Sequence, residues 1–585
     1  MTTYEPDPSA PAVVLWQTGQ YNLSDYRFYV RKRVKILTEA GKNYANFTLR
    51  LRSKGSIKAS TFNLENGEIV EYKVKRSDIY EEEVTEDIIL YKVFLPNVQV
   101  GSIVEIEYSH DWLPYEWRFQ EMIPVMYNEL VVPESRYFIF DVSHYGSTNL
   151  ARHGTYHWSG RDIPAFEIEP YMNAIDNYIG HVEFELKTFT VPGRVFQEFS
   201  TTWDKVGKTL MDDVSFGNLF RTGSSYLNSY ANTLEESDKT PIEKVQLGVE
   251  YIQDNISWNG VNRVYVTRDY RTVFNETHSG SVADMNLNLT ALLQKAGLNA
   301  HPVVLSTVDN GYLKAYKPSL NRLNYVVCLV QIGEEEILVD ATNEHLPIGV
   351  MHPRCLNGSG WLVREEGGRW VEMATDITVE KSFAQIELDS LGNCIAKVRK
   401  TQNLYAYQEW MELYDEFGSE ETFARYMQES YDDLELLEYS SNVTEARNEV
   451  TESYELDMTN SLFDLGDELI LNPFIFSLNL ENPFMADDRY SPVHLEYKSF
   501  VNRTIFVKLP ENYQASELPE PITIATEDGL NYFKMTLTQS GNTISISYQI
   551  AFTRLDIGPD EYPIFKTLYS LMIDKLNESL TLERI

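Results

Sequence analysis

The first third of the chain alternates apolar and polar residues in short runs, which is the side-chain spacing of β-strands. The alternation is clear in residues 21–37 (YNLSDYRFYVRKRVKIL) and 97–112 (NVQVGSIVEIEYSHDW). Residues 61–76 (TFNLENGEIVEYKVKR) predict a hairpin around an Asn-Gly turn. Turn signals recur about every 10 residues up to residue 195, so we expect an antiparallel β-sandwich with a second layer over residues 125–195.

The pattern changes to helical spacing near Thr201. Residues 201–214 (TTWDKVGKTLMDDV) and 240–259 (TPIEKVQLGVEYIQDNISWN) space their apolar side chains three and four apart. Residues 279–300 (SGSVADMNLNLTALLQKAGLNA) carry the clearest helix signals. Ser281 is a good N-cap, Asp284 follows at the capping-box distance, and Gly297 provides a stop. A strand (residues 301–308) and a hairpin (residues 323–343) follow, which predicts a compact α+β domain.

Strands return from residue 382, beginning with SFAQIELDSLGNCIAKVRKT. A helical insert over residues 406–434 interrupts them. A final helix is expected from Asp560, with Asp560 and Glu561 in its first turn and Ile564, Leu568, Leu571 and Met572 docked on a sheet. The sequence therefore predicts an α+β multidomain chain. We expect an N-terminal β-sandwich over residues 1–198, a central α+β domain over residues 199–378, and a C-terminal β-sandwich with helical additions over residues 379–585.

Length and charge limit the classes of function. A chain of 585 residues is too long for a single core. Its formal net charge of −37 argues against nucleic-acid binding, because a phosphate backbone needs a basic surface. No run of about 20 apolar residues predicts a transmembrane segment, and the first residues do not resemble a signal peptide. Cys328, Cys355 and Cys394 are too few and too irregularly spaced for a disulfide framework or a zinc site, so we expect buried thiols.

The hairpin over residues 323–343 can be given a register. If its two strands join at Gly333-Glu334, Val327 lies opposite Asp340, and Tyr325 is a diagonal neighbour of Asp340 on the same face. Cys328, an odd number of positions from Tyr325, points to the other face. The face that carries Tyr325 and Asp340 is then expected to meet the start of the helix that begins after Ser281.

This order of helix start, strand and strand resembles the transglutaminase-like fold of papain-type thiol enzymes. In that family a Cys begins the helix, a His lies on the first strand and an Asp on the second. The matching positions here are Val282, Tyr325 and Asp340, so only the Asp is retained. Residues 95–108 are similar to the uncharacterised β-sandwich domain that precedes such domains in envelope proteins of Gram-negative bacteria. Residues 340–363 resemble the segment that follows the Asp in the same proteins.

The resemblance implies a degenerate triad. A valine cannot ionise, and a tyrosine with a pKa near 10 is about three units too weak a base at neutral pH. We therefore predict a pseudoenzyme with no catalytic residue, no cofactor and no metal. Ser281, Asp284, Tyr325 and Asp340 are predicted to line a groove that binds a peptide or protein partner. The alternative within this class is an envelope scaffold or spacer.

Other interpretations stay open at this point. Ser281 and His278 could form a Ser–His pair, although Ser281 is better explained as a helix cap. A hydrolase or transferase with a non-standard active site is the second class of function, and a component of envelope assembly whose outer sandwiches make the contacts is the third. The resemblance implies a periplasmic or envelope location, with a cytoplasmic one as the alternative. The sequence leaves the oligomeric state open.

Overall fold

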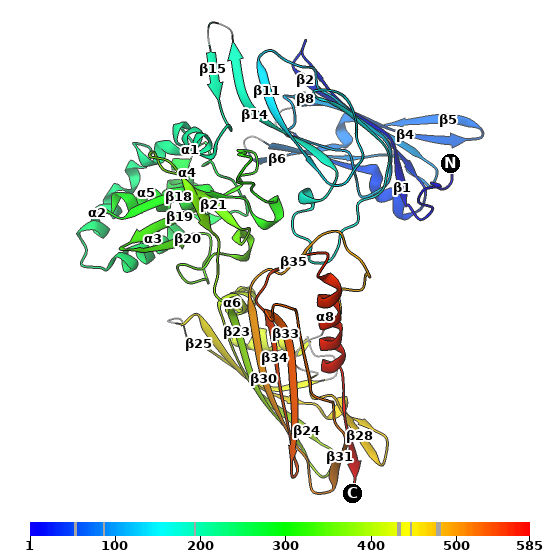
Figure 1. The fold of residues 1–585 in the computed structure, drawn as a ribbon, viewed down its shortest axis with the longest axis vertical. Coiled ribbons are helices and arrows are strands. Elements are labelled where there is room, and N and C mark those ends of the chain that lie inside the picture. Colours follow the sequence, from blue (N-terminus) through cyan, green and yellow to red (C-terminus); the bar gives the residue numbers. More distant parts are fainter. Residues whose placement is uncertain are drawn as a thin grey trace. The chain divides into compact units, whose positions relative to one another are not determined.

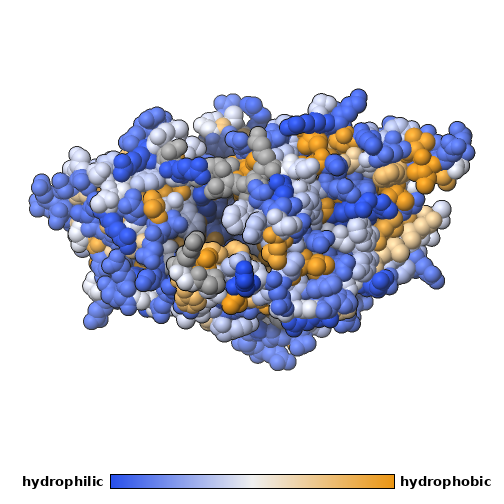
Figure 2. Space-filling view, turned by 90° about the horizontal axis from the view of Figure 1, so that it is seen from above, coloured by the Kyte–Doolittle hydropathy of each residue, from blue (hydrophilic) through white to orange (hydrophobic). Residues whose placement is uncertain are grey.

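The computed structural model describes residues 1–51, 55–85, 88–191, 193, 195–268, 270–429, 434–444, 447–474 and 481–585. The protein is multidomain and mostly β, with 22% helix (Figure 1). The face seen in Figure 2 is mainly hydrophilic, with separate apolar patches. The chain divides into two compact units, so the domain borders at 198/199 and 378/379 stay predictions. The first unit comprises Met1–Ile168, Ala174–Cys328 and Ser359–Val371; the second comprises Glu169–Asn173, Leu329–Gly358 and Glu372–Ile585.

The first unit begins with an eight-stranded sheet in the order β12-β13-β10-β1-β2-β8-β4-β5. Asn66 and Gly67 join β4 to β5 with φ angles of 51° and 87°, as a type I′ turn requires, which confirms the predicted hairpin. Strands β1 and β10 run parallel, an exception to the predicted antiparallel pattern. They are far apart in sequence, and a long connection can return in either direction. The strands are β1 (Ala12–Asn22), β2 (Arg27–Ile36), β4 (Ser56–Glu65), β5 (Glu68–Lys73), β8 (Ile103–Asp111), β10 (Val125–Val131), β12 (Ala151–Gly154) and β13 (His157–Ile163).

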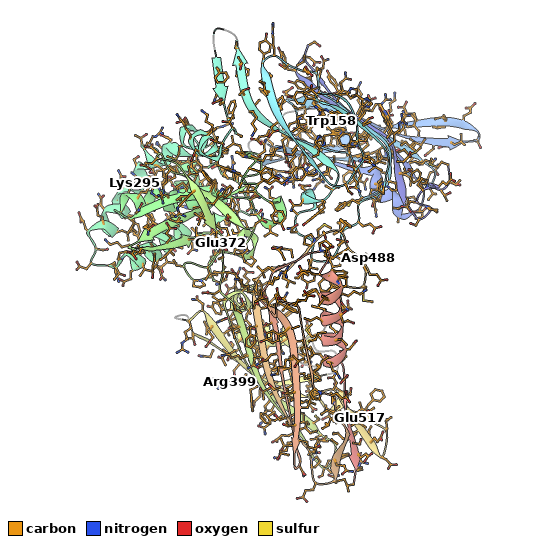
Figure 3. All side chains as sticks on the ribbon, viewed as in Figure 1. Trp158, Lys295, Glu372, Arg399, Asp488 and Glu517 are labelled. Carbon is orange, nitrogen blue, oxygen red and sulfur yellow. The ribbon has the colours of Figure 1, made fainter. Side chains whose placement is uncertain are left out.

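Two smaller sheets share the core of this large sheet. Trp158 of β13, labelled in Figure 3, is 2% exposed, and its ring centroid lies 6.1 Å from that of Phe184 in β14. Buried side chains of both layers form one apolar cluster, as expected for a sandwich. One small sheet contains β3 (Asn46–Leu51), β6 (Ile79–Thr85) and β7 (Ile88–Phe94); the other contains β9 (Glu116–Arg118), β11 (Phe138–Tyr145), β14 (His181–Val191) and β15 (Val195–Glu198).

Helices follow the sandwich, as the sequence predicts. Helix α5 begins after Ser281, whose side chain forms a reciprocal capping box with Asp284, and Gly297 follows its end with a φ of 79°. Every residue of the run 282–293 is buried, so α5 is enclosed on all sides rather than on one apolar face. The helices are α1 (Trp203–Asp212), α2 (Asn228–Glu236), α3 (Pro241–Asn255), the short α4 (Tyr270–Thr272) and α5 (Val282–Lys295).

A five-stranded sheet accompanies these helices, in the order β20-β19-β18-β21-β22. Strand β19 ends just before Gly333-Glu334, and β20 begins just after it. Gly333 has a φ of 63°, as expected for that turn. Asn286 of α5 donates a hydrogen bond from Nδ2 to the carbonyl of Val326 at 2.9 Å, which attaches the helix to the start of β19. The strands are β18 (Asn299–Leu305), β19 (Tyr325–Ile332), β20 (Glu335–Val339), β21 (Ser359–Leu362) and β22 (Arg369–Glu372).

The second unit contains another eight-stranded sheet, in the order β25-β26-β24-β23-β30-β34-β33-β32. Its central pair, β23 and β30, is parallel. A four-stranded sheet, β27-β28-β36-β31, shares its core. The strands are β23 (Thr378–Leu388), β24 (Cys394–Asn403), β25 (Glu435–Thr444), β26 (Glu449–Asp457), β27 (Phe463–Asp464), β28 (Glu468–Leu471), β30 (Ser499–Lys508), β31 (Tyr513–Glu517), β32 (Ile522–Ala525), β33 (Asn531–Ser540), β34 (Thr543–Phe552) and β36 (Leu580–Arg584).

Among the described residues of the second unit, three segments form α-helices. The predicted insert contains α6 (Leu404–Phe417) and α7 (Glu420–Glu429), and its residues 430–433 lie outside the described part. The final helix, α8 (Tyr562–Leu576), begins after Glu561, so the two acidic residues precede its first turn. Leu568 and Met572 are buried as predicted, but Ile564 is exposed because it lies on the solvent side of α8. Among the described residues, no helix combines the length and apolar character needed to span a membrane.

Candidate functional site

The N-terminus of α5 is the place where the resemblance puts a nucleophile. Val282 occupies it, with a fully buried side chain, and its backbone N–H donates to the carbonyl of Val261 at 3.1 Å. The Val282 N–H, a first-turn donor that could otherwise stabilise an anion, is therefore already engaged within the protein.

Asp284 closes this end of the helix from inside. Its Oδ2 accepts hydrogen bonds from the N–H and hydroxyl of Ser281 at 2.8 and 2.7 Å. Its Oδ1 accepts two more, from the N–H and hydroxyl of Thr267 at 2.9 and 3.1 Å. Both Ser281 and Asp284 are fully buried, so they hold a loop to the helix rather than face solvent.

The two strand positions of the predicted degenerate triad are buried as well. Tyr325 is fully buried at the start of β19. Asp340 is 6% exposed and follows β20, and its Oδ1 accepts hydrogen bonds from the N–H and hydroxyl of Thr342 at 3.0 and 2.8 Å. This is the side-chain-to-backbone turn that an Asp at a strand end commonly makes. The predicted cross-strand register of Tyr325 and Asp340 stays a prediction.

The alternative nucleophiles have other partners. His278 is exposed, with a φ of 52°, and its Nδ1 donates to the carbonyl of Asn255 at 2.8 Å, whereas Ser281 is bonded to Asp284. Cys328 and Cys394 are fully buried, and burial raises the pKa of each thiol to about 12. A thiol with that pKa is almost entirely protonated at neutral pH, so neither is a ready nucleophile.

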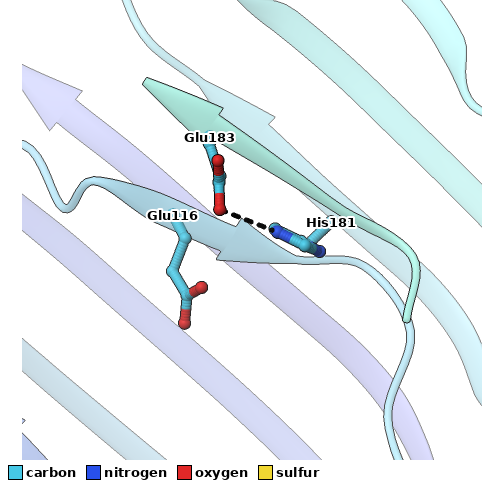
Figure 4. A group of neighbouring side chains, drawn as sticks. All are labelled: Glu116, His181 and Glu183. Atoms are coloured by element: carbon cyan, nitrogen blue, oxygen red, sulfur yellow. Dashed lines mark hydrogen bonds and ion pairs between the residues drawn. The ribbon is translucent and has the colours of Figure 1, made fainter. Parts of the chain in front are cut away.

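A second cluster of ionisable side chains lies in the sandwich, where β9 pairs with β14 (Figure 4). The ligating atoms of Glu116, His181 and Glu183 all lie within 4.8 Å of one another. His181 is fully buried, and its Nδ1 donates to the carbonyl of Ile179 at 2.9 Å. Its Nε2 lies 3.3 Å from Oε1 of Glu183. Since Nδ1 already carries a proton, the second contact is favourable when a proton or a cation also lies at Nε2.

Two guanidinium groups lie among the carboxylates of this cluster. Arg322 forms an ion pair with Glu183, and Arg118 lies 2.6 Å from Asp176 and 3.4 Å from Glu116. These guanidinium groups already supply positive charge to both glutamates, the role that a metal ion would otherwise have. We therefore assign the cluster to an ion network rather than to a metal site.

The two glutamates of the network have opposite pKa shifts. Burial by itself raises the pKa of Glu183, but the hydrogen bond from His181 and the ion pair with Arg322 outweigh burial, and the net shift is downward. For Glu116 burial dominates, and its pKa is raised. The folded state therefore favours a charged Glu183 and disfavours a charged Glu116.

The same strand, β14, holds the segment before Tyr325, residues 311–322, which we call the clamped loop. Glu185 is 7% exposed and accepts hydrogen bonds from the Ser319 hydroxyl at 2.6 Å, the Leu320 N–H at 3.0 Å and the Asn321 amide at 3.1 Å. The hydroxyl of Ser200 donates to the same carboxylate. One buried carboxylate thus connects the sandwich to the clamped loop.

Aromatic contacts complete this junction. The Tyr145 ring stacks on His181 with centroids 4.6 Å apart, and Lys314 Nζ lies 4.2 Å from the Tyr145 centroid. The cavity left between these groups has a volume of about 20 Å³. That is room for about one water molecule, so the junction is a packed polar interface rather than a ligand pocket.

Sequence reasoning missed this network, although a local signal was present. In HVEFELK, residues 181–187, the side chains of His181, Glu183, Glu185 and Lys187 alternate with apolar ones and therefore share one face of a strand. A face carrying an imidazole and two carboxylates indicates a polar partner. Nothing local indicated that the partner would be the loop before Tyr325.

Two family models match parts of the chain. Residues 24–167 match the "Domain of Unknown Function with solved-structure structure (DUF3857)", and residues 467–582 match the "Domain of Unknown Function with solved-structure structure (DUF3858)". Val282, Tyr325 and Asp340 lie outside both matches. Among curated proteins, none matches the chain.

The fold is shared with a solved structure over nearly the whole length. The crystal structure of a "putative protease" from Parabacteroides distasonis aligns with a TM-score of 0.61 at 15% sequence identity, covering 98% of this chain and 99% of that one. At this identity the likeness shows a shared fold and leaves the chemistry of this chain to its own residues.

Proposed function

We propose that this protein is a non-catalytic, transglutaminase-like scaffold of the bacterial cell envelope. The observation that carries the proposal is the burial of Val282 at the position where the resemblance puts the thiol. Its isopropyl group has no exposed surface and no ionisable atom, so it cannot attack a carbonyl.

The contacts around Val282 support the same conclusion. Tyr325, at the position of the base, is fully buried. The Ser281 hydroxyl and the Asp284 carboxylate form hydrogen bonds within the protein. Burial of these residues favours the scaffold over the version in which they line a peptide groove. Contacts with an envelope partner would then come from the outer surfaces of the sandwiches.

A second candidate, a hydrolase or transferase with a non-standard site, is favoured by the likeness to the "putative protease". Two assays separate the candidates: incorporation of a labelled amine into casein, and mass spectrometry of a complex peptide mixture after incubation with the protein. The proposal expects no product above buffer in either. Turnover that disappears in Asp340→Ala but persists in Glu198→Ala, an exposed position on β15, would refute it.

The scaffold role needs its own test, because inactivity alone does not establish it. We expect chemical cross-linking in the native cell, followed by purification of the tagged full chain, to recover the same envelope proteins from wild type and from Asp340→Ala. Recovery of cytoplasmic proteins alone would contradict the envelope location.

A further inference from the structure

The outer face of the large sandwich sheet carries a groove to which the proposed function assigns no ligand. It crosses four adjacent strands, β1, β2, β8 and β4, and has a volume of about 290 Å³. This lies just below the range of about 300–1,000 Å³ that is usual for small-ligand sites. The groove therefore approaches the size of a small-ligand site and is too small for a folded partner.

Strand register arranges the groove in two rows of polar side chains. Arg31 of β2 lies opposite Thr18 of β1 and Glu107 of β8, and Glu107 lies opposite Lys58 of β4. The next row runs through Gln20, Tyr29, Ser109 and Ser56. Because side chains two apart on a strand share a face, both rows point out of the sheet together. The groove thus offers hydroxyl, amide, guanidinium and carboxylate groups within a short span.

The charges in the groove are matched. Arg31 Nε lies 2.7 Å from Glu107, and its Nη2 lies 3.0 Å from Glu105. The guanidinium is therefore paired on two sides, and Lys58 is opposite a carboxylate. A phosphate or sulfate group would have to break these pairs, whereas a neutral ligand can hydrogen-bond to them as they stand.

Tyr29 supplies an apolar platform beside these polar groups. Tyr29 is 42% exposed, and its hydroxyl donates to Asp25 at 2.6 Å, which holds the ring in one orientation. An exposed ring at fixed orientation, next to paired polar groups, is suited to a ligand with one apolar face and many hydroxyl groups.

Peptide binding by strand addition is not available here. Each of the four strands is paired on both sides, β1 by β10 and β2, and β4 by β8 and β5, so their backbone groups are already used. Recognition has to come from side chains alone. We propose that this groove binds a neutral oligosaccharide, with one sugar ring stacked on Tyr29 and its hydroxyls bonded to the Arg31–Glu107 pair.

The test is a glycan microarray probed with the labelled full chain. It carries neutral glucose, mannose, galactose and N-acetylglucosamine oligomers, with sialylated and sulfated glycans beside them. We expect signals from neutral oligomers, and titration calorimetry with the strongest one to give an affinity that falls at least tenfold in Tyr29→Ala. The matched control is Tyr80→Ala, which removes another exposed tyrosine, on β6, and is expected to keep the affinity within twofold.

A second variant keeps the test decisive if Tyr29→Ala folds poorly. Ser56→Trp places a bulky ring at an exposed position on the groove wall and is expected to abolish binding while leaving the melting temperature unchanged. No signal from any neutral oligomer, a preference for charged glycans, or equal affinity in Ser56→Trp and wild type would each overturn the proposal.

Discussion

Removing the carboxylate of Glu185 should release the clamped loop without unfolding the sandwich. Glu185→Ala deletes the acceptor for the Ser319 hydroxyl, the Leu320 N–H and the Asn321 amide. Hydrogen bonds to a charged group contribute about 1.5–3 kcal/mol each, and their effects are not additive because water replaces some of them. We expect a loss of about 3 kcal/mol, which is roughly a 100-fold shift in the opening equilibrium of the loop.

Amide hydrogen exchange measures that equilibrium directly. A multidomain chain does not unfold in one cooperative step, so a local probe is preferable to a melting curve. The Leu320 amide should exchange roughly 100-fold faster in Glu185→Ala, while amides of the large sandwich sheet keep their protection. The matched control is Glu198→Ala, an exposed glutamate on the neighbouring strand β15, which should change neither.

The reasoning fails if the Leu320 amide keeps its wild-type protection in Glu185→Ala. That result would mean that other contacts, such as the one between Lys187 Nζ and the Pro318 carbonyl at 3.2 Å, hold the loop by themselves. Equal loss of protection in the clamped loop and in the sandwich sheet would show instead that the two regions open together.

Three further predictions concern the ion network and the predicted degenerate triad. Glu183→Gln should destabilise the sandwich by about 3–5 kcal/mol at pH 7, because it leaves Arg322 buried without its partner. Glu116→Gln should be neutral or stabilising, because the charge of Glu116 is disfavoured, and amide hydrogen exchange in β14 compares the two variants. The folded-state pKa of Glu183 lies below its ordinary 4.5, so its contribution to folding stability is complete above that value and is lost as the pH falls below it. Acid titration followed by fluorescence should therefore find a smaller loss of stability in Glu183→Gln than in wild type. Val282→Cys with Tyr325→His should restore no amine incorporation and should cost about 2–4 kcal/mol, since a fully buried ring is replaced by a smaller polar one; regained turnover would contradict the burial argument.

Local chemistry made both ends of α5 predictable. The Ser281 cap and the Asp284 capping box act together at its start, the Gly297 stop acts on its last turn, and the structure confirms all three. The Asn66-Gly67 turn is predictable for the same reason. A short-range signal of this kind needs no knowledge of the rest of the fold.

The face that α5 presents was harder to predict. Its leucines indicated one apolar side, but Asn286, Asn288 and Thr290 are fully buried too. Each has a backbone acceptor: Asn288 and Thr290 donate to the carbonyls four residues earlier, and Asn286 donates to the Val326 carbonyl at the start of β19. Polar residues in a helix suggest solvent until their partners are known, so periodicity underestimated how far this helix is enclosed.

By itself, the sequence determined the β–α–β succession, the caps and turns, and the absence of an ionisable side chain at position 282, because these depend on residue identity and on neighbours along the chain. Tertiary structure alone decided the ion network and the clamped loop. Glu185 and Leu320 are 135 residues apart, and Glu183 meets Arg322 at a similar separation. Whether a buried carboxylate destabilises or supports a fold depends on the donors that packing brings to it, and no local pattern specifies those donors.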